Sequence, residues 1–203
     1  DLDAISLPTK PVVSFVKTPH DRIAIEIMRG CPWQCRFCQS TVIKRPLRIR
    51  KVETIVNAAL EAYRNTGCEE ISLLSLSTSD YPHFEELVKR MAEVFAPLGV
   101  NVSLPSLRVN NQAEEIARIS RQETGRFREV VASVSNFVPK PHTPYQWSKM
   151  QPREYFERVR GYMLSKTTIR SVKIKQHDID TSFLEGVLTR GDRRVGRAMI
   201  QAW

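Results

Sequence analysis

The stretch RGCPWQCRFCQS, from Arg29 to Ser40, holds three of the four cysteines of this 203-residue chain. Cys31, Cys35 and Cys38 follow the spacing C-x3-C-x2-C, and Cys68 is distant in sequence. A disulfide framework needs an even set of cysteines in an oxidising compartment, and a structural zinc site needs four closing ligands. Three clustered thiols favour an iron–sulfur cluster with one iron open to another ligand, and zinc or another cluster type remain as alternatives.

The length and composition suit one folded domain, because 41% of the residues are hydrophobic and can form a core. No run approaches the roughly 18 apolar residues of a membrane span. Nothing resembles a targeting peptide, so we expect a cytoplasmic protein with no membrane association. The chain opens with Asp1 rather than Met, so we expect it to be processed or to be part of a longer chain.

The charge is strongly basic, with a formal net charge of +9 from 31 basic and 22 acidic residues. The densest basic run is KRPLRIRK, from Lys44 to Lys51, and a second is RGDRR, from Arg190 to Arg194. Such runs form either a solvated basic face or a rim that binds phosphate, carboxylate or RNA. No aromatic-rich RNA module accompanies them, so an anionic or RNA partner is one of two open interpretations.

The hydrophobic pattern alternates between strands and helices, which predicts a parallel α/β architecture. The predicted strands are Val12–Val16, Arg22–Met28, Glu70–Ser77, Val100–Leu104, Glu129–Val138 and Ser171–Lys175. The predicted helices are Lys51–Thr66, Phe84–Phe95, Ala113–Ile119, Tyr155–Met163 and two pieces of Thr181–Trp203 around Gly191. A strand–helix unit of a barrel takes roughly 31 residues, so Arg22 to Asp178 holds about five units.

The cysteine spacing, with Phe37 just before the last cysteine, resembles the motif of the radical S-adenosylmethionine (radical SAM) superfamily. Further stretches are similar to the radical SAM core of uncharacterised bacterial proteins of the cobalamin-binding type. These stretches are ISLLSLSTSDY, LPSLRVN, FVPKPHTPYQW and SFLEGVLTRGDRR. The methylthiotransferase branch, which acts on RNA or ribosomal protein, shares the cysteine spacing and is the second resemblance.

The resemblance implies a partial (β/α) barrel of radical SAM type with about five to six parallel strands. We expect an N-terminal arm at 1–21, a radical SAM core at 22–178 and a C-terminal helical extension at 179–203. The core has an internal shortening near 110–126, where family members have further strand–helix units, so the barrel is expected to be incomplete. The cobalamin-type domain of this branch is not expected within the chain.

The resemblance also implies the cofactors and the reaction. A [4Fe–4S] cluster binds SAM at its open iron, receives an electron from a flavodoxin- or ferredoxin-like donor and cleaves SAM reductively. The resulting 5′-deoxyadenosyl radical acts on a substrate that the sequence does not identify. The alternatives are a truncated, catalytically silent relative that binds a cluster, and a methylthiotransferase-like enzyme that modifies RNA or protein.

The resemblance assigns Cys31, Cys35 and Cys38 as the metal ligands. The residues expected to bind SAM come from the cysteine loop and from the ends of the second and third core strands: Phe37, Ser75, Ser77, Ser79, Asp80, Ser106 and Arg108. Phe37 would pack against the adenine or over the cluster. The serines and Asp80 would contact the methionine end, and Ser106 and Arg108 would meet the SAM carboxylate or ribose.

Each of these residues also has an ordinary structural interpretation. Phe37 could pack within its own loop, Asp80 could cap the following helix, and Ser106 and Arg108 could lie in a solvated loop. Cys68 is expected to be structural, at the helix-to-strand turn on the side opposite the site. No catalytic residue is singled out by the sequence.

Overall fold

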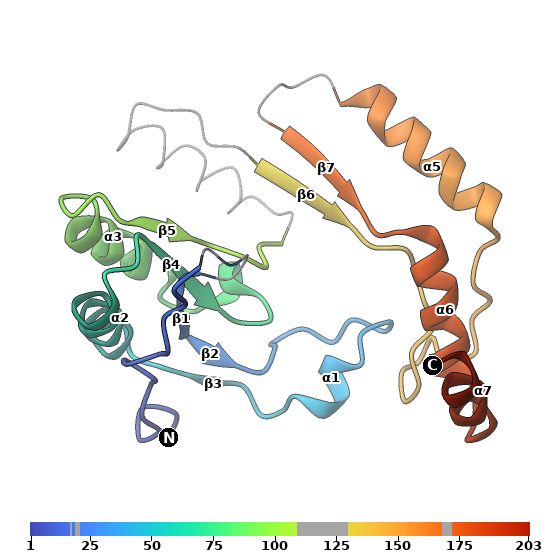
Figure 1. The fold of residues 1–203 in the computed structure, drawn as a ribbon, viewed down its shortest axis with the longest axis horizontal. Helices are drawn as coiled ribbons and strands as arrows, with labels where there is room; N and C mark the ends of the chain where they lie inside the picture. Colours follow the sequence, from blue (N-terminus) through green and yellow to red (C-terminus); the bar gives the residue numbers. More distant parts are fainter. Residues whose placement is uncertain (17, 19–20, 109–129, 168–171) are drawn as a thin grey trace. The chain divides into compact units, whose positions relative to one another are not determined.

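The computed structural model describes residues 1–16, 18, 21–108, 130–167 and 172–203. The chain forms two compact units, the first from Asp1–Trp33 with Ile43–Glu115 and the second from Gln34–Val42 with Ile116–Trp203 (Figure 1). Each unit contains parallel strands and helices, so the predicted α/β class is confirmed.

The first unit is built on a three-stranded parallel sheet in the order β1-β4-β5. Its strands are β1 (Ile23–Glu26), β4 (Glu70–Leu74) and β5 (Asn101–Ser103), with Ile23 opposite Ile71 and Ile71 opposite Val102. Helix α2 (Val52–Thr66) connects β1 to β4 by way of β2 and β3, and α3 (Phe84–Phe95) connects β4 to β5 (Figure 1). A spatial order that follows the chain order is expected of consecutive strand–helix units in a barrel.

One face of this sheet is buried under the two helices. Side chains alternate across a strand, so Ile23 and Ile25 of β1 are buried while Ala24 between them is exposed. On β4, Ile71 and Leu73 are buried, and the outward-facing residues are Ser72, which is buried, and Leu74, which is 44% exposed. The helical faces that complete this core are Val52, Ile55, Val56, Ala59 and Ala62 of α2 and Phe84, Leu87, Met91 and Phe95 of α3.

The predicted strand Arg22–Met28 is interrupted at Ile27, where the chain leaves the sheet. The Ile27 N–H donates to the Leu74 carbonyl at 3.0 Å, and its own carbonyl accepts from the Arg50 N–H at 3.0 Å. The chain then continues as β2 (Met28–Arg29), which pairs antiparallel with β3 (Arg48–Ile49). The short helix α1 (Ser40–Ile43) lies between these two strands in the sequence.

Arg50 is 1% exposed, so neither interpretation of the basic run Lys44–Lys51, a solvated face or an anion-binding rim, applies to this residue. Its Nη1 donates to the carbonyls of Leu2 and Ile5 at 2.6 and 2.8 Å, and its Nη2 lies 3.8 Å from Glu26 Oε2. A buried guanidinium must be surrounded by acceptors because its desolvation is costly. Arg50 therefore fastens the start of the chain to the end of β1.

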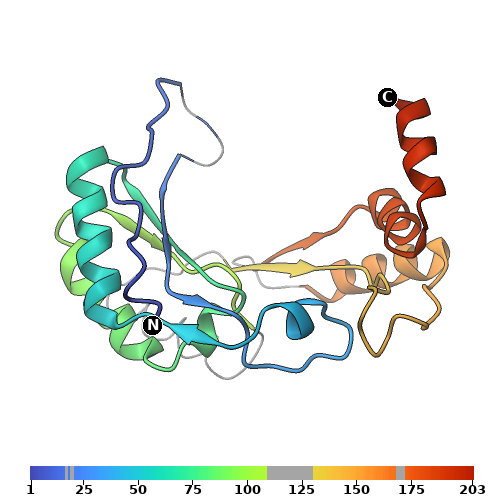
Figure 2. The same cartoon turned by 90° about the horizontal axis from the view of Figure 1, so that it is seen from below.

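The predicted strand Val12–Val16 is wrong, because the segment has no strand pairing and Val12 and Phe15 are fully exposed. Pro11 lacks the N–H that a strand ladder needs. The arm instead runs beside α2, where the Thr9 hydroxyl donates to Glu61 and the Asn65 amide donates to the Thr9 carbonyl, both at 2.9 Å (Figure 2).

The second unit contains the parallel pair β6 (Val130–Val134) and β7 (Val172–Gln176). Helix α5 (Arg153–Lys166) lies beside β7 (Figure 1). Its Phe156 is buried, with ring centroids 6.2 Å from Phe183 and 5.7 Å from Tyr155. The two helical pieces predicted around Gly191 are confirmed as α6 (Ile179–Arg190) and α7 (Arg194–Ala202).

Helix α6 begins earlier than the sequence pattern predicts because Asp178 caps it. The Asp178 carboxylate accepts the Thr181 N–H at 2.8 Å, which satisfies one of the free amides of the first turn. Close packing against the segment after β6 also fixes this helix, since a Cβ on Gly186 would lie 3.0 Å from Met150 Sδ.

The described residues contain five parallel strands, divided between a three-stranded and a two-stranded sheet, and they show no closed barrel. This agrees with the predicted partial barrel. The predicted helix Ala113–Ile119 and the shortening near 110–126 lie outside the described residues. No helix in the described ranges is both long and apolar enough to cross a membrane.

We predict that Arg50→Ala lowers the free energy of unfolding by about 3 kcal/mol, because it removes a buried guanidinium that donates to the Leu2 and Ile5 carbonyls and lies beside Glu26. The matched control is Arg48→Ala, which removes an exposed arginine of β3 and should change stability by at most about 0.5 kcal/mol. Urea unfolding of the metal-free chain measures both, and equal midpoints for the two variants would contradict this role of Arg50.

Candidate functional site

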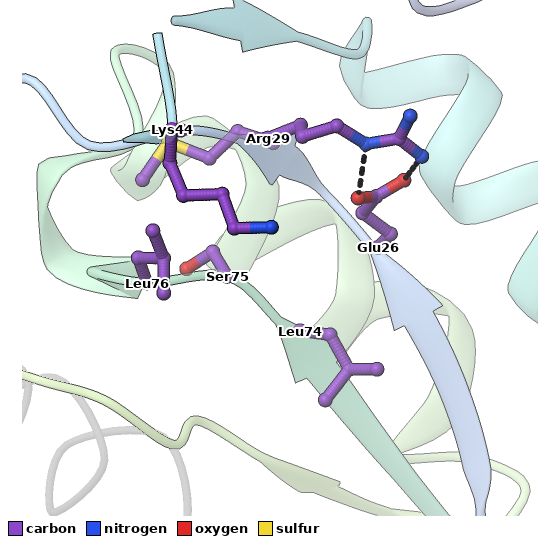
Figure 3. A pocket seen from close by; sticks show the side chains of 8 residues that line it. Glu26, Arg29, Lys44, Leu74, Ser75 and Leu76 are labelled. Carbon is purple, nitrogen blue, oxygen red and sulfur yellow. Dashed lines mark hydrogen bonds and ion pairs between the residues drawn. The ribbon is translucent and has the colours of Figure 1, made fainter. Parts of the chain in front are cut away.

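A cavity of about 450 Å³ lies at the carboxyl ends of β1 and β4 (Figure 3). Its lining residues belong to the first unit: Glu26, Met28, Arg29, Gly30, Lys44, Leu74, Ser75 and Leu76. Open parallel α/β sheets bind their ligands at this end, because connecting loops diverge there and leave strand-end side chains accessible. The cavity is therefore a candidate for a binding site.

The cavity wall carries charges of both signs. Glu26 accepts two hydrogen bonds from Arg29, at 2.8 Å from Nε and 2.7 Å from Nη2, and this contact is the main reason that the Glu26 pKa lies below its ordinary value. Figure 3 shows the Lys44 side chain pointing into the space framed by Glu26, Leu74 and Ser75. Glu26 is thus ionised at neutral pH and already paired, while the Lys44 ammonium has no partner among the described residues.

Gly30 stands at the rim of this cavity, directly before Cys31. Its φ of +100° lies in a region that L side chains rarely adopt, and a Cβ would lie 2.8 Å from the Lys44 carbonyl oxygen and 3.1 Å from the Leu47 Cα. Only glycine lets the segment that returns toward β3 pass so close to the start of the cysteine loop. The geometry of the rim therefore depends on this residue.

The hydroxyl groups predicted to contact SAM are mostly engaged within the chain. Ser75 and Thr78 share a hydrogen bond of 2.9 Å, and Ser77 donates to Oδ2 of Asp80. Ser77 and Ser79 are buried, and only Ser75 lines the cavity. These residues lie in or next to the 3₁₀ turn η1 (Thr78–Asp80). Their hydroxyl groups therefore stabilise the turn that follows β4, and few of them are left to bind a ligand.

Asp80 does not cap the helix that follows, so that alternative is wrong. The residue before α3 is His83, which makes no side-chain cap. The Asp80 carboxylate instead accepts the indole N–H of Trp33 at 2.6 Å. This bond joins the end of β4 to the cysteine loop.

Ser106 and Arg108 follow β5 and fold back onto the same turn. The Ser106 carbonyl accepts the Thr78 N–H at 3.1 Å, and the Arg108 N–H donates to Ser79 Oγ at 3.1 Å. The Arg108 guanidinium lies over the Trp33 ring, 4.0 Å from its centroid. Its Nη1 is buried without a hydrogen-bond partner among the described residues, so Arg108 is not a solvated loop residue.

Sequence reasoning missed Trp33, Lys44 and Glu26 at this end of the sheet. Trp33 had a usable signal, because it stands between the first two cysteines of the loop. Glu26 is the last residue of an otherwise apolar strand, and a charged residue at that position indicates a carboxylate near the carboxyl end of the sheet. Lys44 was grouped with the general basic run, and only the fold separates it from the buried Arg50.

The three loop cysteines are free and half-buried, and the two units divide them: Cys31 belongs to the first unit, Cys35 and Cys38 to the second. The Cys38 N–H donates to the Cys35 carbonyl at 3.0 Å, so these two lie in one turn. No three His, Cys, Asp or Glu side chains of the described residues are gathered tightly enough to hold a metal ion. The donor chemistry nevertheless fits an iron–sulfur cluster, which binds thiolates and excludes disulfide-bonded sulfurs.

The second unit holds its part of the loop through Arg36. The Arg36 carbonyl accepts the Tyr145 N–H at 3.2 Å, and its guanidinium carbon lies 5.3 Å from the centre of the Tyr145 ring. Phe137 supports that ring edge-on, with 6.1 Å between centroids. The Phe37 side chain is 53% exposed.

Cys68 lies apart from these residues, between α2 and the amino end of β4. Its N–H donates to the Thr66 hydroxyl. This is the end of β4 opposite the cavity, as predicted, and a structural role for Cys68 stays a prediction.

The family described as the Radical SAM superfamily matches residues 25–176, which include all three loop cysteines, the cavity and the Trp33–Asp80–Arg108 contacts. The chain belongs to the Radical SAM superfamily. This confirms the family predicted from the cysteine spacing, and with it a class of enzymes that uses a [4Fe–4S] cluster and SAM. The finer resemblance of this radical SAM chain to the cobalamin-binding type stays a prediction.

The radical SAM chain is similar to several larger proteins. It is 32% identical over 100 residues to an uncharacterised protein of Methanocaldococcus jannaschii, covering 49% of this chain and 22% of that protein. It is 25% identical over 99 residues to a ribosomal protein uS12 methylthiotransferase of Elusimicrobium minutum, covering 41% and 23%.

A tRNA-2-methylthio-N(6)-dimethylallyladenosine synthase of Staphylococcus epidermidis is 26% identical over 132 residues, covering 64% of this chain and 24% of the synthase. The chain thus spans less than a quarter of the length of each of these three relatives.

We predict that Gly30→Ala destabilises the metal-free chain by about 2 kcal/mol, because alanine is strained at this φ and its Cβ meets backbone atoms. The control is Gly161→Ala in α5, where a Cβ meets nothing within 4 Å and helix propensity predicts a gain of about 0.5 kcal/mol or more. Thermal unfolding followed by circular dichroism separates the two, and a neutral or stabilising Gly30→Ala would contradict the close approach at the rim.

Proposed function

We propose that this chain provides the cluster- and SAM-binding part of a radical SAM enzyme. The observation that carries the proposal is the position of the cysteine loop, since Cys31 directly follows Gly30 at the rim of the cavity formed by the strand ends. Family membership makes a [4Fe–4S] cluster and SAM the expected occupants.

Cys31, Cys35 and Cys38 are proposed to bind the cluster as thiolates. All three thiols are free of disulfide bonds and half-buried, so they are available as ligands. A cluster held there would supply one electron from an external reductant to SAM, whose S–C5′ bond would break to give methionine and a 5′-deoxyadenosyl radical. The remaining residues of the chain bind and orient SAM and limit the access of water.

The methionine end of SAM is proposed to lie near η1. Asp80 offers a carboxylate to its ammonium group, and Arg108 offers a buried, unpartnered Nη1 to its carboxylate. The apolar wall of Met28, Leu74 and Leu76 suits the carbon chain of a ligand. Ser75 contacts this space directly, whereas Ser77, Ser79 and Ser106 are proposed to act by fixing the turn.

Phe37 is proposed to cover the adenine or the cluster, because its ring is exposed within the cysteine loop. The electron would come from an external flavodoxin- or ferredoxin-like donor. The substrate is not identified by the chain. A cytoplasmic location, the domain division at 1–21, 22–178 and 179–203, and the internal shortening remain predictions.

A second candidate is a methylthiotransferase-like activity on RNA or protein. Two relatives carry names of this kind, one for a tRNA and one for a ribosomal protein. The structure adds that Lys44, Arg45 and Arg48 of the basic run are exposed, although Arg50 is not. Exposed Lys and Arg attract phosphates through counterion release, so an anionic partner fits this side of the first unit.

We predict that anaerobic reconstitution loads about four irons per chain and that alanine at Cys31, Cys35 or Cys38 abolishes loading, because each removes one of only three thiolates. Cys68→Ala is the matched control and should load as the wild type does. Iron analysis and the visible absorption of the reconstituted chain measure this, and full loading of Cys35→Ala would refute the ligand assignment.

The same reconstituted chain, reduced with dithionite, distinguishes an active enzyme from a catalytically silent relative. Production of 5′-deoxyadenosine, absent in the three loop-cysteine variants, supports the active enzyme. Full cluster loading without SAM binding or cleavage would instead support the silent relative.

We predict that the chain binds tRNA at low salt and that the affinity falls steeply as salt rises. Replacing Lys44, Arg45 and Arg48 together by Gln should weaken binding about tenfold. The slope of the logarithm of the binding constant against the logarithm of the salt concentration should become less steep by up to about three, one for each lost phosphate contact. The control replaces Arg193, Arg194 and Arg197 of the C-terminal region in the same way. Filter binding measures both, and an equal loss in the two triple variants would show that the basic run near the cavity has no special role.

A further inference from the structure

Two charged side chains meet at Trp33, which stands between Cys31 and Cys35. The indole Nε1–H donates to Oδ2 of Asp80 at 2.6 Å, and the indole ring carries the Arg108 guanidinium at 4.0 Å from its centroid. Asp80 belongs to η1, and Arg108 follows β5. Three separate segments of the first unit therefore converge on one tryptophan.

Both charged groups keep a free binding position. The hydrogen bonds to Asp80 from Trp33 and Ser77 end on the same oxygen, Oδ2, which leaves Oδ1 without a donor among the described residues. Arg108 Nη1 is buried and also lacks a partner there. A buried guanidinium N–H without an acceptor costs free energy, which indicates that an anionic group is the missing partner.

The acid and the arginine do not pair with each other, although both contact Trp33, and the described residues show no ion pair between them. The indole explains this arrangement. Its N–H can only donate, so it attracts the carboxylate at its edge, while its face attracts the guanidinium. The acceptor Oδ1 of Asp80 and the donor Nη1 of Arg108 then match the ammonium and carboxylate groups of an α-amino acid.

We propose that Trp33 is a positioning residue that presents Asp80 and Arg108 separately to the ammonium and carboxylate of the methionine end of SAM. This inference rests on the proposed function. With phenylalanine at position 33 the ring remains under the guanidinium, but the N–H that holds Asp80 is gone. Asp80 is then free to turn toward Arg108 and compete with the ligand.

The experiment compares Trp33→Phe with Trp203→Phe, which changes a fully exposed tryptophan at the last residue of the chain. Equilibrium dialysis of SAM against the reconstituted chain should show about tenfold weaker binding for Trp33→Phe, the effect of one hydrogen bond to a charged group, and no change for Trp203→Phe. In an Asp80→Ala background, Trp33→Phe should have less than a twofold further effect.

Two further readouts separate positioning from a general structural role. Affinity for 5′-methylthioadenosine, which lacks the α-amino acid group, should be the same in Trp33→Phe and the wild type. In the metal-free chain, the indole N–H resonance that disappears in Trp33→Phe should shift in Asp80→Ala.

The outcomes are distinct. A wild-type chain that loads its cluster and fails to bind SAM refutes the proposed function, and this inference falls with it. SAM binding by the wild type with equal affinity in Trp33→Phe refutes only the inference. Equal losses of SAM and 5′-methylthioadenosine, or an indole resonance unaffected by Asp80→Ala, likewise overturn it.

Discussion

The buried guanidinium of Arg50 determines how the parts of the first unit meet. A charge in the interior must be surrounded by acceptors, and here they come from the N-terminal arm and from Glu26 at the end of β1. The Arg50 carbonyl in turn accepts the hydroxyl of Tyr81, whose pKa is raised by burial to about 12. The arm, the end of β1 and the turn after β4 are thus fixed by one residue, which lies between β3 and α2.

The cavity follows from this arrangement. Glu26 is held between Arg29 and Arg50, so its carboxylate remains ionised and oriented along the wall. Ile27 then diverts the chain out of the parallel sheet into the β2–β3 ribbon, and Gly30 lets the returning segment pass close by. The cysteine loop begins where these constraints end, which places its first cysteine, Cys31, next to the rim of the cavity.

The cysteine loop is also anchored separately within each unit. In the first unit, Trp33 binds Asp80 and Arg108 at the strand ends. In the second, Arg36 binds the backbone and ring of Tyr145. Such contacts restrict the loop within each unit, so a ligand that bound to it would cost less conformational entropy.

The sequence by itself determined the family, the alternation of strands and helices, and the residues able to bind a cluster. Helices α2 and α3 and strands β4 and β5 were predicted well because their burial is periodic and local. The three exposed valines and Phe15 of the arm misled the same reasoning, since a strand also needs a partner that only the fold supplies.

Only the tertiary structure decided which charges are buried and which are free. Arg50 and Lys44 lie in one basic run, yet Arg50 is buried and donates to two carbonyls, whereas Lys44 points into the cavity. Asp80 was assigned two roles by sequence, and the structure replaced the helix cap with a bond to Trp33. Such partners lie 47 or 48 residues apart in the chain. No local pattern records contacts at that separation, because packing between distant segments alone sets them.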